Sequence, residues 1–222
     1  GSALGANALA ASAFVVSQAA AAAATVSWVL MEWKFNGKPT VLGAVSGCIA
    51  GLVAITPAAG FVEPLPAIII GLIGGGICYF AVAVLKDKLG YDDSLDAFGI
   101  HGIGGTWGSL ATGLWATTGV NPAGANGLFY GETDLFVAQV ISTVVAYALA
   151  IVGTFILFKI VSAICDVRAD ESEELAGLDI VEHGERGYGR SVVGGTIMGS
   201  FEDSSEMLAN TVMKVNAKGG AV

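Results

Sequence analysis

Charged residues are scarce in this sequence. Only 13% of its 222 residues are Asp, Glu, Lys or Arg, whereas 54% are hydrophobic, and the mean hydropathy is +0.72. A soluble domain usually has about 25% charged residues, which it needs to cover its surface. The scarcity of charge therefore argues against a water-soluble fold and predicts an integral membrane protein.

Basic residues and cysteines are few as well. Ten Lys and Arg stand against nineteen Asp and Glu, and the resulting net charge of −9 argues against a nucleic-acid partner. The three cysteines, Cys48, Cys78 and Cys165, are scattered without the spacing of a metal site. We interpret them as small packing residues and expect neither a metal nor another cofactor.

Long runs, uncharged except for Asp96 at the start of the fourth, fill much of the remaining sequence. A helix needs about 20 apolar residues to cross the ~30 Å hydrocarbon layer of a bilayer. Five runs reach this length: residues 7–31, 40–62, 65–85, 95–118 and 135–158. They predict an all-α integral membrane fold with five transmembrane helices within residues 1–165. An acidic tail follows over residues 166–222, and residues 201–215 are expected to form a short amphipathic helix in it.

The basic residues of the connecting loops predict the orientation. Lys34 and Lys38 follow the first run and Lys86 and Lys88 follow the third, whereas the second and fourth loops carry no Lys or Arg. Short loops rich in Lys and Arg stay in the cytoplasm. We therefore expect the chain to start outside the cell, to cross the membrane five times and to end in a cytoplasmic tail.

His101 lies inside the fourth run, between Gly99 and Gly102. An ionisable side chain at membrane depth is costly and by default indicates a functional site. A neutral imidazole donates one hydrogen bond and accepts another, so it can line a pore for a small polar solute and relay a proton. A structural histidine bonded to a neighbouring helix is the alternative. Asp96 begins the same run and is interpreted as a helix cap, or as an anchor of the cytoplasmic end of the pathway.

Four segments of the chain resemble sequence motifs of one membrane protein family. Residues 92–102 read DDSLDAFGIHG and resemble the signature around the second pore histidine of the ammonium transporters, the Amt/Mep/Rh family. Residues 1–7 resemble the motif just after the family's sixth helix, and residues 43–60 resemble its Gly-rich stretch that ends in T-P-A-x-G. Residues 177–188 resemble its C-terminal motif. The similarity fades after about residue 190.

The resemblance implies a fold and a function. The five runs would correspond to helices 7–11 of an eleven-helix ammonium transporter, whose N-terminal half is missing here. His101 would be one of a twin-histidine pair in the pore, and Ser2 would be the serine that bonds ammonium at the outer vestibule. The implied protein is not an enzyme but a plasma-membrane transporter for nitrogen uptake, assembled as a homotrimer, that passes ammonium or ammonia.

The resemblance also implies a regulatory role for the tail. Gly177, Asp179, His183 and Gly184 belong to the segment that regulates transport in the family, where a PII signal protein can plug the pore from inside. Two alternatives remain. One is an ammonium sensor that couples pore occupancy to its cytoplasmic tail. The other is a membrane redox enzyme with His101 as a haem ligand, which would need a second ligand that the runs do not offer.

Overall fold

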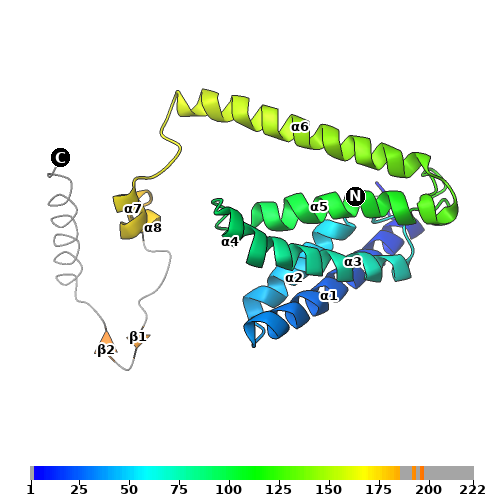
Figure 1. The fold of residues 1–222 in the computed structure, drawn as a ribbon, viewed down its shortest axis with the longest axis horizontal. Helices are drawn as coiled ribbons and strands as arrows, with labels where there is room; N and C mark the ends of the chain where they lie inside the picture. The colour runs from blue at the N-terminus through cyan, green and yellow to red at the C-terminus, as the bar shows by residue number, and fades with distance from the viewer. Residues whose placement is uncertain (1–2, 186–191, 194–195, 198–222) are drawn as a thin grey trace. The chain divides into compact units, whose positions relative to one another are not determined.

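The computed structural model describes residues 3–185, 192–193 and 196–197 (Figure 1). The chain divides into two compact units, Gly1–Ile151 and Val152–Val222. Ser2 and the helix expected over residues 201–215 lie outside the described residues. The division between membrane region and tail expected after residue 165 stays a prediction.

Helices follow one another along the first unit, and the last of them continues beyond it (Figure 1). Two of the elements, η1 and η2, are π-helical turns, and η3 is a 3-10 turn. In chain order the elements are α1 (Ala8–Asn36), α2 (Val41–Ile55), α3 (Pro64–Phe80), η1 (Ala81–Leu85), α4 (Lys86–Leu89), η2 (Phe98–Gly102), α5 (Ile103–Trp115), η3 (Leu128–Tyr130) and α6 (Asp134–Ser162).

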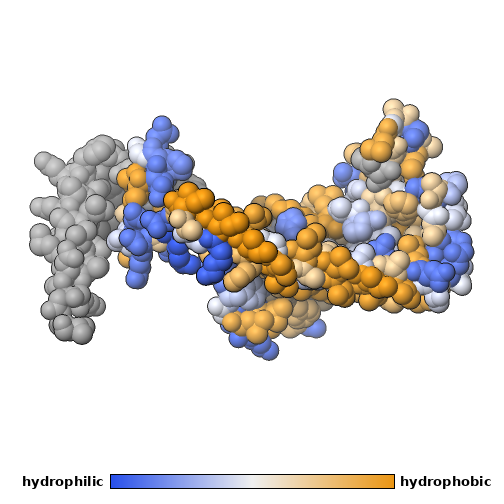
Figure 2. All heavy atoms as spheres, turned by 90° about the horizontal axis from the view of Figure 1, so that it is seen from above, coloured by the Kyte–Doolittle hydropathy of each residue, from blue (hydrophilic) through white to orange (hydrophobic). Residues whose placement is uncertain are grey.

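Three helical stretches are long and apolar enough to cross a membrane: Ala8–Asn36, Pro64–Leu89 and Asp134–Ser162. They coincide with the first, third and fifth expected runs. The second and fourth runs coincide with shorter helices, α2 and η2–α5. Figure 2 shows apolar side chains over much of the visible helical surface. The helical membrane fold is therefore confirmed, whereas the number of five crossings stays a prediction.

Helix α2 begins at a capping threonine and ends before a proline. The Thr40 hydroxyl accepts a hydrogen bond from the Gly43 amide at 2.9 Å. Glu32, buried near the end of α1, accepts hydrogen bonds from the amide of Thr40 at 2.9 Å and from its hydroxyl at 2.8 Å. Pro57 has no amide hydrogen and disfavours helix continuation, and α2 ends at Ile55. Helix α2 is therefore shorter than the expected run 40–62, because it stops just before this proline.

Small residues let α1, α2 and α3 pack backbone against backbone. Ala20 and Ala24 of α1 are both 0% exposed. A Cβ atom on Gly51 of α2 would lie 2.5 Å from the Ala20 carbonyl oxygen, and one on Gly75 of α3 would lie 2.5 Å from that of Ala24. A Cβ atom on Gly71 of α3 would also collide with the Ala20 carbonyl oxygen. Close backbone approach through small residues is how helices associate in lipid.

The second unit holds short elements. They are α7 (Glu171–Ala176), α8 (Leu178–Val181) and the antiparallel strands β1 (Val192–Val193) and β2 (Thr196–Ile197). Asp170 begins α7 with a capping box, in which the Glu173 carboxylate accepts a hydrogen bond from the Asp170 amide at 3.0 Å. Reciprocal bonds of this kind satisfy amides that the first turn of a helix leaves free.

Candidate functional site

His101 lies on η2, the π-helical turn that leads into α5. Such turns are rare and often occur at functional sites. The side chain of His101 is exposed and lines a groove of about 420 Å³ between η2–α5 and α6. No residue in the described part of the chain hydrogen-bonds to the imidazole, so a histidine tied to a neighbouring helix has no support within this unit.

The walls of the groove carry small and hydroxyl-bearing side chains. On η2 and α5 the lining residues other than His101 are Gly102, Gly105, Thr106 and Ser109, and on α6 they are Ser142, Thr143, Ala146, Tyr147 and Ala150. A Cβ atom on Gly105 would meet nothing within 4 Å, so the space beside this turn is open. The wall can hydrogen-bond a small polar solute. It contains no carboxylate, and no group of His, Cys, Asp and Glu in the described residues could hold a metal ion.

Hydrogen bonds between polar side chains join α5 to α6 along this groove. The Ser109 hydroxyl donates to the Gln139 side-chain oxygen at 2.8 Å and accepts from the Thr143 hydroxyl at 2.9 Å. Further along, Thr106 Oγ1 and Tyr147 Oη lie 2.7 Å apart. We call these five residues the polar seam. Helix α6 has no buried residue, so the seam rather than a packed apolar face ties this part of α6 to α5.

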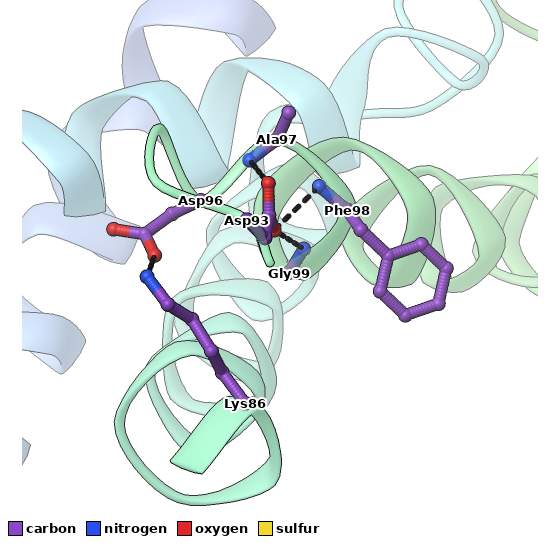
Figure 3. Close-up of polar contacts among 6 residues, drawn as sticks. All are labelled: Lys86, Asp93, Asp96, Ala97, Phe98 and Gly99. Carbon is purple, nitrogen blue, oxygen red and sulfur yellow. Dashed lines mark hydrogen bonds and ion pairs between the residues drawn. The ribbon is translucent and has the colours of Figure 1, made fainter. Parts of the chain in front are cut away.

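Asp93 caps the helix that carries the exposed histidine (Figure 3). Its Oδ1 atom accepts a hydrogen bond from the Ala97 amide at 2.8 Å. Its Oδ2 atom accepts from the amides of Phe98 at 3.0 Å and Gly99 at 3.4 Å. The first amides of a helix have no partner within it, and a carboxylate there also complements the helix dipole. Asp93 therefore determines where this helix begins.

The Asp96 side chain does not cap the helix, although one interpretation of the sequence predicted that it would. Its backbone lies in the left-handed region (φ 56°), which Asp tolerates better than most residues, and its carbonyl accepts the Ile100 amide at 2.9 Å. Its carboxylate forms an ion pair with Lys86 of α4 at 2.7 Å (Figure 3). The cap falls to Asp93 because its carboxylate, one turn earlier, reaches the free amides. Asp96 instead ties α4 to the start of η2, and its place near a pore stays a prediction.

The tail residues singled out in the sequence lie in a locally bonded segment of the second unit. Gly177 (φ 99°) and Gly184 (φ 66°) have positive φ angles, which glycine adopts without strain. The Asp179 carbonyl accepts a hydrogen bond from the Glu185 amide at 3.1 Å. His183 is exposed. A regulatory role for this segment stays a prediction.

Two residues of the site escaped the sequence analysis. Asp93 was overlooked in favour of Asp96, because its separation of four to six residues from the amides it binds is longer than that of an ordinary cap. Tyr147 is the only tyrosine of the run 135–158, and a phenol group in an apolar run signals a hydrogen bond within the membrane. The structure brings Tyr147 to the same groove as His101.

Comparison with known proteins adds an independent finding. The family model described as the Ammonium Transporter Family matches residues 1–188. The chain is 57% identical over 188 residues to an ammonium transporter of Bacillus subtilis (strain 168), an alignment that covers 85% of this chain and 46% of the relative. It is 48% identical over 189 residues to ammonium transporter Amt1 of Archaeoglobus fulgidus, covering 85% of this chain and 47% of that protein. The chain thus spans about half the length of the curated relatives it matches.

Solved structures agree with these relatives. The crystal structure of Saccharomyces cerevisiae Mep2 matches with a TM-score of 0.65 and 38% identity, covering 68% of this chain and 35% of that one. A structure named Sensor Amt Protein matches with a TM-score of 0.67 over 81% of this chain and 43% of that one. Its identity of 23% supports a common fold and nothing further.

Proposed function

The chain belongs to the ammonium transporter family, and from this premise we propose that it forms part of a transporter that passes ammonium or ammonia through a narrow apolar pore. His101 is the pore-lining residue in this proposal. The observation that carries it is the placement of the imidazole, which is exposed in a groove with hydroxyl groups and has no hydrogen-bond partner among the described residues.

The chemistry of the imidazole suits this task. A bare monovalent cation pays a high cost to enter an apolar pore. Ammonium differs from a metal cation because it can release a proton and cross as neutral ammonia. One ring nitrogen of a neutral imidazole accepts a hydrogen bond and the other donates one. His101 can therefore take a proton on its free nitrogen and release the proton on its other nitrogen, while the neutral molecule moves past it.

The proposed function also implies partners for this chain. We propose that the groove beside His101 forms one wall of the pore, and that an N-terminal half supplies the other wall and a second histidine. We further propose that the whole protein is a homotrimer in the plasma membrane with a cytoplasmic C-terminus. The lysines at the ends of α1 and α4 support this orientation. Residues 177–188 are proposed as the regulatory segment and as a contact for a PII signal protein.

Reconstitution in proteoliposomes tests the function. The protein with its complete native sequence should take up ammonium, and His101→Ala should largely abolish uptake at matched protein level and unchanged thermal stability. Binding of ammonium without any flux would favour the sensor alternative. Full uptake by the His101→Ala variant with unchanged selectivity would refute the role of His101.

A further inference from the structure

Tyr147 of α6 hydrogen-bonds to the turn that carries His101. We infer that Tyr147 is a positioning residue, which holds this turn in place through the carbonyl group of Gly102. The inference rests on the proposed function of His101 for its effect on transport, although the contact itself does not depend on that function. Its consequence is that α6 helps to set the direction of the imidazole.

Three oxygen atoms form the contact. Gly102 follows His101 directly, and its carbonyl accepts a hydrogen bond from Thr106 Oγ1 at 2.7 Å and from Tyr147 Oη at 3.2 Å. The two hydroxyl oxygens lie 2.7 Å apart. Each hydroxyl has one proton, so Thr106 can donate to Gly102 while Tyr147 donates either to Thr106 or directly to Gly102. In both arrangements the phenol of Tyr147 is linked to the Gly102 carbonyl, either directly or through the Thr106 hydroxyl.

This contact differs from the rest of the polar seam. The bonds among Ser109, Gln139 and Thr143 join α5 to α6 but touch no atom of η2. The bond from Tyr147 to Gly102 is the one hydrogen bond in the described residues that connects α6 to η2. Tyr147 shares with the other seam residues the task of joining α6 to α5, through Thr106, and it differs from them in also reaching the backbone of η2.

The turn needs such a restraint for two reasons. A π-helical turn departs from the regular hydrogen bonding of an α-helix, so a lateral bond has more influence on its rotation there. In the proposed function η2 lies at membrane depth, where a carbonyl group requires partners because water is absent. Loss of the phenol would leave the Gly102 carbonyl with Thr106 as its side-chain partner and would let the turn rotate.

Tyr147→Phe tests the inference, because it removes the hydroxyl and keeps the ring. The control is Tyr79→Phe, which also removes only a hydroxyl. Tyr79 of α3 shares a core cluster with Ile100 of η2, but its hydroxyl bonds the Asn36 side chain at 3.4 Å and no described atom of η2. Both are made in the protein with its complete native sequence. We measure hydrogen–deuterium exchange of residues 98–103, and the ratio of ammonium to potassium flux in proteoliposomes.

We expect Tyr147→Phe to speed amide exchange in residues 98–103 and to lower the flux ratio, each by roughly three- to tenfold, the effect of losing one neutral hydrogen bond. Tyr79→Phe should change neither. Thr106→Val, which removes the second partner of the same carbonyl, should shift both quantities in the same direction as Tyr147→Phe.

Two results would overturn the inference: unchanged exchange in Tyr147→Phe, or equal changes in Tyr147→Phe and Tyr79→Phe. If the unsubstituted protein shows no ammonium flux, the proposed function fails, and exchange alone then decides the role of Tyr147. Faster exchange confined to residues 98–103 would still support positioning, and unchanged exchange would still refute it.

Discussion

A Cβ atom placed on Gly99 would lie 2.8 Å from Cγ2 of Val82, so the two π-helical turns η1 and η2 touch through a glycine. Val82 is β-branched, and its side chain has little freedom to turn away within a helix. The same Cβ atom would lie 3.5 Å from the Val82 backbone nitrogen. The spacing between η1 and η2, and with it the placement of His101, therefore depends on the missing side chain of Gly99.

The first prediction is that Gly99→Ala pushes η2 away from η1. Overpacking of this kind costs roughly 1–3 kcal/mol, and the displacement should lower ammonium uptake as well. The double variant Gly99→Ala with Val82→Ala should recover a large part of both losses, because the second change removes the colliding methyl groups. Thermal denaturation in detergent and uptake in proteoliposomes measure the two effects. A double variant that is worse than either single variant would contradict this explanation.

A second prediction concerns the cap formed by Asp93. Asp93→Ala leaves three amides at the start of η2 without a side-chain partner, and we expect a loss of about 0.5–2 kcal/mol in the free energy of unfolding. Asp93→Asn should lose less, because its side-chain oxygen still accepts. Asp87→Ala removes an exposed carboxylate near the same loop and serves as the control. Equal melting temperatures for the Asp93→Ala and Asp87→Ala variants would show that the cap is unimportant.

A third prediction compares two helical glycines. Gly71→Ala places a methyl group against the Ala20 carbonyl, where neither backbone can move away easily. The substitution should therefore prevent α1 and α3 from packing against each other. Gly153→Ala adds the same methyl group where nothing lies within 4 Å. Because alanine is the better helix former by about 1 kcal/mol, Gly153→Ala should be neutral or stabilising. Thermal stability and the yield of folded protein distinguish the two variants. If Gly71→Ala is as stable as the unsubstituted protein, α1 and α3 do not pack through this contact.

Long apolar runs predicted much of this fold, because a helix that crosses a membrane needs about 20 consecutive apolar residues. The apolar runs located each of the main helices of the first unit, although α2 ends earlier than the run 40–62 suggested. The run 95–118 also predicted the helix that carries His101. Length alone could not establish that α2 and η2–α5 cross a bilayer, since both are shorter than the other stretches.

The finer features of the site were not predictable because they depend on local geometry. The left-handed backbone of Asp96 moves the cap to Asp93, and no propensity distinguishes these two aspartates. The contact between η2 and η1 through Gly99 and Val82 joins two separate helical elements, and no local pattern in the sequence indicates it. The bond between Tyr147 and Gly102 joins residues 45 positions apart and follows only from how α6 lies beside α5.

The last prediction concerns charge at the position of His101. His101→Glu replaces the imidazole ring by a side chain that can carry a negative charge. His101→Gln has a similar length and stays neutral, so it isolates the effect of charge. A carboxylate in an apolar pore attracts bare cations, and a pore with such a group should admit potassium. We therefore expect potassium leak in His101→Glu proteoliposomes and none in His101→Gln.

Ammonium uptake separates two explanations of that result. His101→Gln can still donate and accept hydrogen bonds, but its amide does not take up a proton at neutral pH. If His101 relays protons, ammonium uptake should fall in His101→Gln while potassium remains excluded. If the imidazole serves only as a hydrogen-bonding wall, uptake should persist. Potassium exclusion by the His101→Glu variant, in protein that is folded and inserted at the normal level, would show that this side chain does not face the conduction path.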